Sequence, residues 1–154
     1  MWKRPSPSRA DPTSGSDALE QALRALRHRE RSATEVDRFL AARGVGDAER
    51  DAVLETLERT SLVDDRRFAE ARASALAGRG GGDELIRHEL TRAGVAGELV
   101  EEAITSLPAE MQRAERIVER RGAGPKTARY LAGKGFSEDV VHAVVADSRG
   151  EPLG

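Results

Sequence analysis

The side chains of this sequence whose type and spacing could do chemistry are mainly arginines. Arg113, Arg116 and Arg120 lie three and four residues apart, so a helix would place them on one face. Such a row could meet the phosphates of a nucleic acid or the carboxylates of an acidic protein. The alternative is a solvated face in which the arginines pair with Glu115 and Glu119, one turn away. We take as candidate contacts for a partner or for DNA the basic side chains Arg72, Arg79, Arg87, Arg92, Arg116, Arg120, Arg121, Lys126, Arg129 and Lys134.

The sequence offers no catalytic or metal-binding constellation. Its three histidines, His28, His88 and His142, are scattered, and there is no cysteine to act as a thiolate ligand. Residues 78–82 are rich in glycine but lack the lysine and the preceding strand of a phosphate-binding loop, so we interpret them as a flexible link. We therefore predict a protein that is not an enzyme and needs neither a metal nor a cofactor.

Charge and composition exclude further classes of protein. The formal net charge is −2, whereas domains that coat nucleic acid are usually strongly basic. No aromatic platform accompanies the basic residues, which argues against a single-strand binder that stacks bases. No apolar run approaches the ~20 residues that span a bilayer, and the N-terminus lacks the apolar core of a secretory signal. We expect a cytoplasmic protein without a membrane partner.

Three copies of one helix-end pattern organise the chain. A leucine precedes a glycine by four residues, and an apolar residue follows the glycine, in the segments 40–45, 90–95 and 131–136. Glycine adopts the left-handed conformation beyond a helix end without steric cost, and the next residue folds back onto the leucine. We predict helix caps of this kind at Gly44, Gly94 and Gly135.

Other local signals predict where helices begin. Ser32 and Glu35 match a capping box, which would start a helix at residue 33. The Asp64-Asp65 pair could be an acid/base or metal pair, but it stands directly before an apolar-periodic helix, so we predict Asp64 to be an N-cap. Pro125 suits the first position of a helix. Asp47, Pro108 and Ser137 are expected at the starts of three further helices.

These signals predict an all-α fold of three tandem three-helix repeats that form an elongated, curved array. Each unit of about 45 residues would be marginal alone and would gain stability by stacking on its neighbours. The predicted parts are a disordered N-terminal tail over 1–17, repeats over 18–62, 63–107 and 108–148, and a frayed C-terminal tail over 149–154. The first helix is expected over about 18–31.

The stretch from Leu62 to Val95 resembles the hallmark segment of the RecX family of bacterial RecA regulators. The resemblance rests on Leu62-Val63-Asp64-Asp65, on Arg67-Phe68-Ala69, on Arg79-Gly80, and on Ile86-Arg87 with Glu89-Leu90 and Gly94-Val95. Segments 29–35 and 131–141 resemble the first and last repeats of the family, so the likeness covers about residues 18–147.

The resemblance implies three three-helix repeats and a partner. Members of the family bind the RecA filament, inhibit the recombinase and ATPase activities of RecA in DNA repair and recombination, and have weak affinity for single- or double-stranded DNA. The resemblance thus implies a non-enzymatic regulator, which we expect to be a monomer. Asp83 and Glu84 stand where basic residues are common in the family, which moves any DNA contact toward Lys126, Arg129 and Lys134.

Two other functions stay open at this point. One is a helical DNA-binding module that acts without RecA and uses short helix pairs like helix-turn-helix units. The acidic net charge lowers its weight. The other is a generic helical adaptor, because a fold alone does not fix a function.

Overall fold

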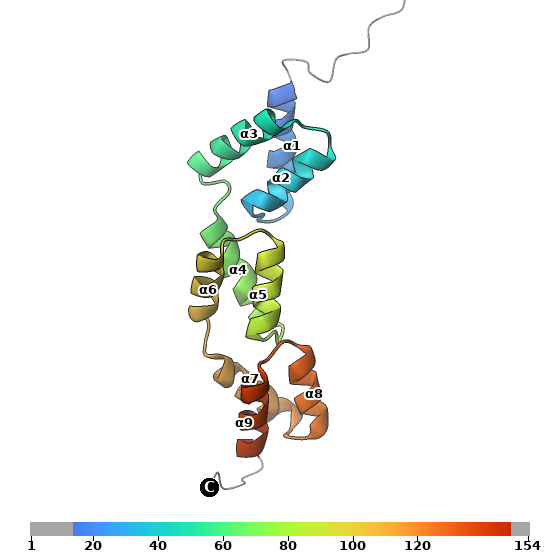
Figure 1. Cartoon of the computed structure of the whole chain (residues 1–154), viewed down its shortest axis with the longest axis vertical. Coiled ribbons are helices and arrows are strands. Elements are labelled where there is room, and N and C mark those ends of the chain that lie inside the picture. Colours follow the sequence, from blue (N-terminus) through green and yellow to red (C-terminus); the bar gives the residue numbers. More distant parts are fainter. Residues whose placement is uncertain (1–13, 149–154) are drawn as a thin grey trace, which may run out of the picture. The chain divides into compact units, whose positions relative to one another are not determined.

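The computed structural model describes residues 14–148, and the tail residues 1–13 and 149–154, for which we predicted disorder and fraying, lie outside that range. Within it the chain is helical throughout, without a strand (Figure 1). The helices are α1 (Ser14–His28), α2 (Ala33–Ala42), α3 (Asp47–Arg59), α4 (Asp65–Gly78), α5 (Asp83–Arg92), α6 (Gly97–Thr105), α7 (Glu110–Arg121), α8 (Pro125–Gly133) and α9 (Glu138–Ser148). This is the predicted all-α fold of repeated helices.

Each consecutive set of three helices has its own hydrophobic core. Leu40 and Leu57 are fully buried in the core of α1–α3, Ile86 and Leu90 in that of α4–α6, and Leu131 in that of α7–α9. The chain divides into two compact units, Met1–Asp65 and Arg66–Gly154, so the second and third helix sets lie in one unit. We refer to the three sets as the first, second and third helix groups.

The boundary between the first two groups lies a little later than the sequence suggested. Val63, which we assigned to the second repeat, is buried in the first core. Asp65, the last residue of the first unit, accepts a hydrogen bond from the backbone N–H of Ala33 at 2.8 Å. The segment after α3 therefore still packs on the first group, and the first residue of α4 contacts the start of α2.

Three helices end at the glycines that mark the repeat. Gly44, Gly94 and Gly135 have φ angles of 83°, 80° and 90°. In each case the residue after the glycine donates its N–H to the leucine carbonyl, at 3.1, 3.1 and 3.0 Å, and the glycine donates to the residue three before it. These two bonds define a Schellman motif, which satisfies carbonyls that a helix end leaves open.

Two more helices end in the same way without the sequence pattern that we used. At the end of α4, Gly80 has a φ of 87° and Gly81 donates to the Leu76 carbonyl at 2.9 Å. At the end of α3 the left-handed residue is Ser61, with a φ of 61°, and Leu62 donates to the Leu57 carbonyl at 2.9 Å. Serine hides this end from a search for glycine.

Helix starts follow the local signals with small differences. Both hydrogen bonds of the Ser32–Glu35 capping box are present, since each side chain accepts from the backbone N–H of the other residue. Pro125 is the first residue of α8, and Asp64 lies directly before α4. Asp47 is the first helical residue rather than the cap, because Gly46 takes the cap position and the Asp47 carboxylate accepts from Arg50 at 2.6 Å. α1 begins four residues earlier than predicted, at Ser14, with Asp17 in the first turn, where a negative charge suits the helix dipole.

The glycines after α4 form a close contact, which corrects our interpretation of a flexible link. Gly82 donates its N–H to the Lys134 carbonyl at 2.8 Å, and Glu84 donates to the Gly135 carbonyl at 3.0 Å. A Cβ atom on Gly82 would lie 2.4 Å from the backbone of Gly135 and Phe136, and one on Gly135 would lie 2.6 Å from the backbone nitrogen of Leu85. The α4–α5 turn and the α8–α9 turn thus meet backbone to backbone, and only glycine fits there.

This contact predicts a strong effect of Gly82→Ala. The new methyl group overlaps backbone atoms that cannot rotate away, so the second and third helix groups must separate at this point. We expect the variant to lower the free energy of unfolding by about 3 kcal/mol, the upper end of overpacking costs. Thermal and urea unfolding followed by circular dichroism measure the loss.

Gly97→Ala is the matched control. Gly97 is the first residue of α6, and a Cβ atom there would meet nothing within 4 Å. The substitution should be neutral or stabilise the protein by up to about 1 kcal/mol through the unfolded state. Equal melting temperatures for the two variants would contradict the proposed close contact.

Candidate functional site

A buried arginine lies at the junction of the second and third helix groups. Arg113 of α7 is only 7% exposed and uses all three nitrogens of its guanidinium group. Its Nε donates to the Pro108 carbonyl at 3.0 Å, its Nη1 donates to the Gly81 carbonyl at 2.8 Å, and its Nη2 pairs with the Asp83 carboxylate. A buried guanidinium is stable only when its donors are satisfied, and here the acceptors come from both groups.

Glu110 completes the junction from the start of α7. Its carboxylate accepts from the Asp83 N–H at 2.8 Å and from the Ser137 hydroxyl at 3.0 Å. Burial raises the pKa of Asp83, the Glu110 carboxylate adds to this, and the Arg113 guanidinium acts in the opposite direction. The starts of α5, α7 and α9 are therefore joined through two carboxylates and one guanidinium.

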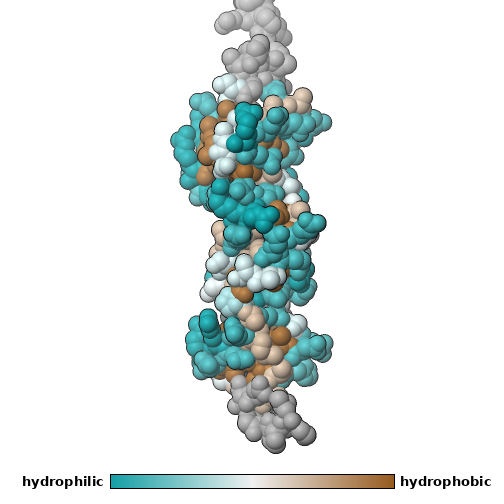
Figure 2. Space-filling model, turned by 90° about the vertical axis from the view of Figure 1, so that its left-hand side faces the viewer, coloured by the Kyte–Doolittle hydropathy of each residue, from teal (hydrophilic) through white to brown (hydrophobic). Residues whose placement is uncertain are grey.

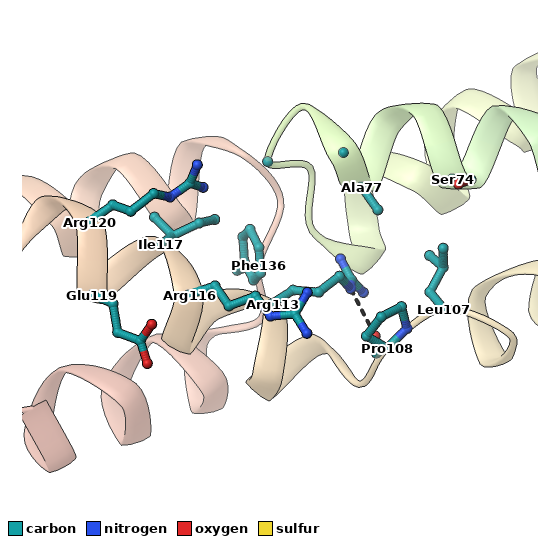
Figure 3. Close-up of a pocket in the computed structure, with 12 residues that line it drawn as sticks. Ser74, Ala77, Leu107, Pro108, Arg113, Arg116, Ile117, Glu119, Arg120 and Phe136 are labelled. Carbon is teal, nitrogen blue, oxygen red and sulfur yellow. Dashed lines mark hydrogen bonds between the residues drawn. The ribbon is translucent and has the colours of Figure 1, made fainter.

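A cleft of about 550 Å³ opens beside this junction (Figure 3). Its most buried side chains are Ile117 and Phe136, which are 4% and 5% exposed. The guanidinium carbon of Arg113 lies 5.8 Å from the centre of the Phe136 ring. The lining is completed by Ser74, Ala77, Gly78, Gly80, Leu107, Pro108, Arg116, Glu119 and Arg120. Pro108 lies in this wall, two residues before α7 rather than at its first position.

Two of the candidate basic residues in the second group are paired with carboxylates. Arg87 meets Glu101 with two hydrogen bonds, of 2.8 and 3.0 Å, and also pairs with Glu84. These bonds lower the pKa of Glu101 and raise that of Arg87. Arg72 lies 4.0 Å from the Glu89 carboxylate. Arg87 joins α5 to α6 and has little capacity left for a partner, whereas the longer contact of Arg72 is a weaker one.

The remaining candidates of the second group are Arg79 and Arg92. Arg79 is exposed and donates to the Ala75 carbonyl of its own helix at 3.4 Å. Arg92 is exposed at the end of α5.

The candidates of the third group are mostly free. Arg116, Arg120, Lys126 and Arg129 are exposed, and none of them forms an ion pair within 4.0 Å in the part of the chain that the structure describes. Glu115 and Glu119 also form no ion pair among the described residues. The alternative interpretation, in which the arginines of this face pair with these two glutamates, is therefore not found. The third group therefore presents positive charge that the fold itself does not use.

An aromatic ring does accompany these charges, contrary to our expectation. The guanidinium carbon of Arg121 lies 3.8 Å from the centre of the Tyr130 ring, and the Lys134 ammonium lies 5.9 Å from it. Such cation–π contacts hold basic side chains in place without neutralising them. Lys134 follows Tyr130 by four residues, and this spacing was the signal in the sequence that we missed.

The first group contains a similar arrangement that the sequence reasoning also missed. The guanidinium carbons of Arg43 and Arg31 lie 4.2 and 5.6 Å from the centre of the Phe39 ring. Arg43 follows Phe39 by four residues, the same spacing as for Tyr130 and Lys134. Burial lowers the pKa of Arg31, whose Nε also donates to the Ala25 carbonyl at 3.2 Å.

The described region contains neither a candidate metal site nor a candidate membrane span. Its histidine and carboxylate side chains form no cluster of three that could hold a metal ion. None of its helices has the length and apolarity needed to cross a membrane.

The fold and the site define an all-α protein of repeated three-helix groups with basic surfaces. The model of the second three-helix domain of RecX matches residues 64–104. Regulatory protein RecX of Halorhodospira halophila is 34% identical over 150 residues, which cover 88% of this chain and 92% of that protein. Its counterpart in Mycolicibacterium vanbaalenii is 34% identical over 175 residues, covering 94% and 95%.

Solved structures agree with these relatives in the fold. The crystal structure of RecX from Lactobacillus salivarius superposes with a TM-score of 0.74 over 88% of this chain and 96% of that chain, at 20% identity. The chain belongs to the RecX family of regulatory proteins. The family and fold expected from the residues 62–95 are thus confirmed.

The buried arginine makes a prediction about stability. Arg113→Ala leaves the Asp83 carboxylate and two carbonyls without their donor, and removing one partner of a buried pair costs about 3 kcal/mol or more. Arg129→Ala, in the next helix and exposed, should change the free energy of unfolding by less than about 0.5 kcal/mol. Urea unfolding of both variants tests the difference, and an Arg113→Ala variant as stable as the control would contradict the network.

The Arg87–Glu101 pair makes a prediction about pH. Because the pKa of Glu101 is lowered in the folded protein, its contribution is present above the unfolded value of 4.5 and is lost as the pH falls through the lowered value. Glu101→Gln should therefore cost about 0.5 kcal/mol at pH 7, as for other partly exposed pairs, and progressively less as the pH falls below 4.5.

Glu115→Gln controls for the change of charge, since Glu115 is exposed in the middle of α7 and forms no ion pair among the described residues. It should leave stability nearly unchanged between pH 7 and pH 3. A cost of Glu101→Gln that stays constant between pH 7 and pH 3 would show that the ion pair is not its source.

Proposed function

We propose that this protein is a non-enzymatic regulator that binds RecA filaments and restrains their recombinase and ATPase activities. The observation that carries the proposal is the similarity to proteins named regulatory protein RecX over nearly the whole of both chains. The family resemblance of residues 62–95 supplies RecA as the partner. A monomeric protein in the cytoplasm, where RecA acts on DNA, fits this role.

The unpaired charges of the third group support the proposal physically. A partner surface that carries carboxylates or DNA phosphates can be bound by Arg116, Arg120, Lys126 and Arg129 without breaking an ion pair of the fold. By contrast, use of Arg87 would first require its separation from Glu101 and Glu84. The third group is therefore the better candidate for the contact with the filament.

A second candidate function is direct binding of DNA without RecA. It is favoured by Tyr130 with Arg121 and Lys134. An aromatic ring can stack on a base, and the cations beside it can bind backbone phosphates. Its weight is lowered by the net charge of −2 and by the ion pairs with Glu84 and Asp83, which occupy Arg87 and Arg113.

The test is a titration of RecA-driven ATP hydrolysis on single-stranded DNA. We expect inhibition at ratios well below one chain per RecA subunit. The triple variant Lys126→Gln, Arg129→Gln, Lys134→Gln should raise the half-inhibitory concentration about tenfold, since each lost charge contact contributes a fraction of a kcal/mol to about 1 kcal/mol. The control Arg72→Gln, Arg87→Gln removes charges that are already paired and should change it by less than about twofold.

Two results would contradict the proposal. Equimolar protein that leaves hydrolysis unchanged and does not sediment with RecA–DNA filaments would exclude RecA regulation. Binding to duplex DNA in the absence of RecA, with a steep salt dependence and a loss in the triple variant, would favour the DNA-binding module instead.

A further inference from the structure

The cleft at the junction of the second and third groups combines an apolar interior with a basic rim. Ile117 and Phe136 form its depth, and Leu107, Pro108 and Ala77 contribute further apolar wall. Figure 3 shows Phe136 between the side chains of Ile117 and Arg113. Figure 2 shows apolar residues reaching the surface over the third group between hydrophilic flanks.

The rim carries two cations that the fold does not use. Arg116 and Arg120 lie one helical turn apart on α7, line the cleft, and form no ion pair in the described region. Arg113, three residues before Arg116, is fully occupied by Gly81, Asp83 and Pro108 and fixes the wall. One arginine of this row therefore builds the cleft, and two remain available to an occupant.

We propose that this cleft binds a short acidic segment of a partner protein, which places one apolar side chain against Ile117 and Phe136. Carboxylates on either side of that apolar residue would pair with Arg116 and Arg120. A volume of about 550 Å³ lies in the usual range for binding sites and holds an aromatic or large aliphatic side chain with its backbone. The inference takes one point from the proposed function, namely that the occupant belongs to a partner protein.

The apolar interior favours a peptide over a nucleic acid backbone. Sugar and phosphate groups gain nothing from burial against Ile117, Phe136 and Leu107, whereas an apolar side chain gains in proportion to the area removed from water. Two free cations are few beside the six to ten phosphate contacts that are common for DNA-binding proteins.

The walls of the cleft are held in place before any partner binds. The backbone contact between Gly82 and Gly135 and the hydrogen bonds of Arg113 join the two helix groups that form it. A site that is already formed loses less conformational freedom on binding, which raises affinity. The junction thus serves the cleft as well as the fold.

The test uses the full chain and a fluorescein-labelled peptide in which one phenylalanine stands between two aspartates on each side. Fluorescence anisotropy should show saturable binding. Arg116→Gln, Arg120→Gln should weaken it about tenfold, and so should replacement of the peptide's phenylalanine by alanine. The control Lys126→Gln, Arg129→Gln removes two exposed charges of the same group that do not line the cleft, and should weaken binding by less than about twofold.

The same variants separate this inference from the proposed function. If the peptide does not bind while the chain still inhibits RecA-driven ATP hydrolysis, the cleft proposal is wrong and RecA regulation stands. If the peptide binds through Arg116 and Arg120 while RecA is unaffected, the cleft proposal stands and the proposed function is wrong. Displacement of the peptide from this cleft by a short oligothymidylate at equal concentration, or equal binding of the alanine peptide, would overturn the apolar insertion.

Discussion

The junction of the second and third helix groups depends on one buried guanidinium. Burying the charge of Arg113 is costly, and the cost is offset only because Gly81, Asp83 and Pro108 supply acceptors at the right places. These acceptors come from the α4–α5 turn, the start of α5 and the segment before α7. The three must stay together for the charge to be satisfied, so this interaction explains why α4–α9 form one compact unit with two cores.

The local rules of helix ends made most of the fold predictable from the sequence. The Ser32 capping box, Pro125 at a first position and the glycines at 44, 94 and 135 all act within a few residues, so their meaning does not depend on distant contacts. Gly82 shows the limit of such reasoning. Locally it indicates freedom, but its place is set by the backbone of residues 134–136, about fifty positions later in the chain.

The charged residues were harder to assign for the same reason. Arg113, Arg116 and Arg120 are equivalent in a helical repeat, yet the first is buried and the other two are free. Arg87 is occupied by Glu101, which follows it by 14 residues on another helix. No spacing rule within one helix distinguishes these cases, because the partner lies across a tertiary contact. Tyr130 with Lys134 was within reach of such a rule, since Lys134 caps the end of α8 four residues after Tyr130.

The pairing of charges divides the molecule by role. Where an arginine has a carboxylate within reach, as between α5 and α6, the ion pair joins two helices. Such an arginine is poorly suited to bind a second partner. Where the carboxylates lie too far away, as around Arg116 and Arg120, the charge remains to attract and orient another molecule. A chain with a net charge of −2 can therefore still present a locally basic surface beside an apolar cleft. Such a surface suits recognition of one acidic segment that carries an apolar side chain better than general adhesion to DNA, because sugar and phosphate groups gain nothing from burial in an apolar cleft.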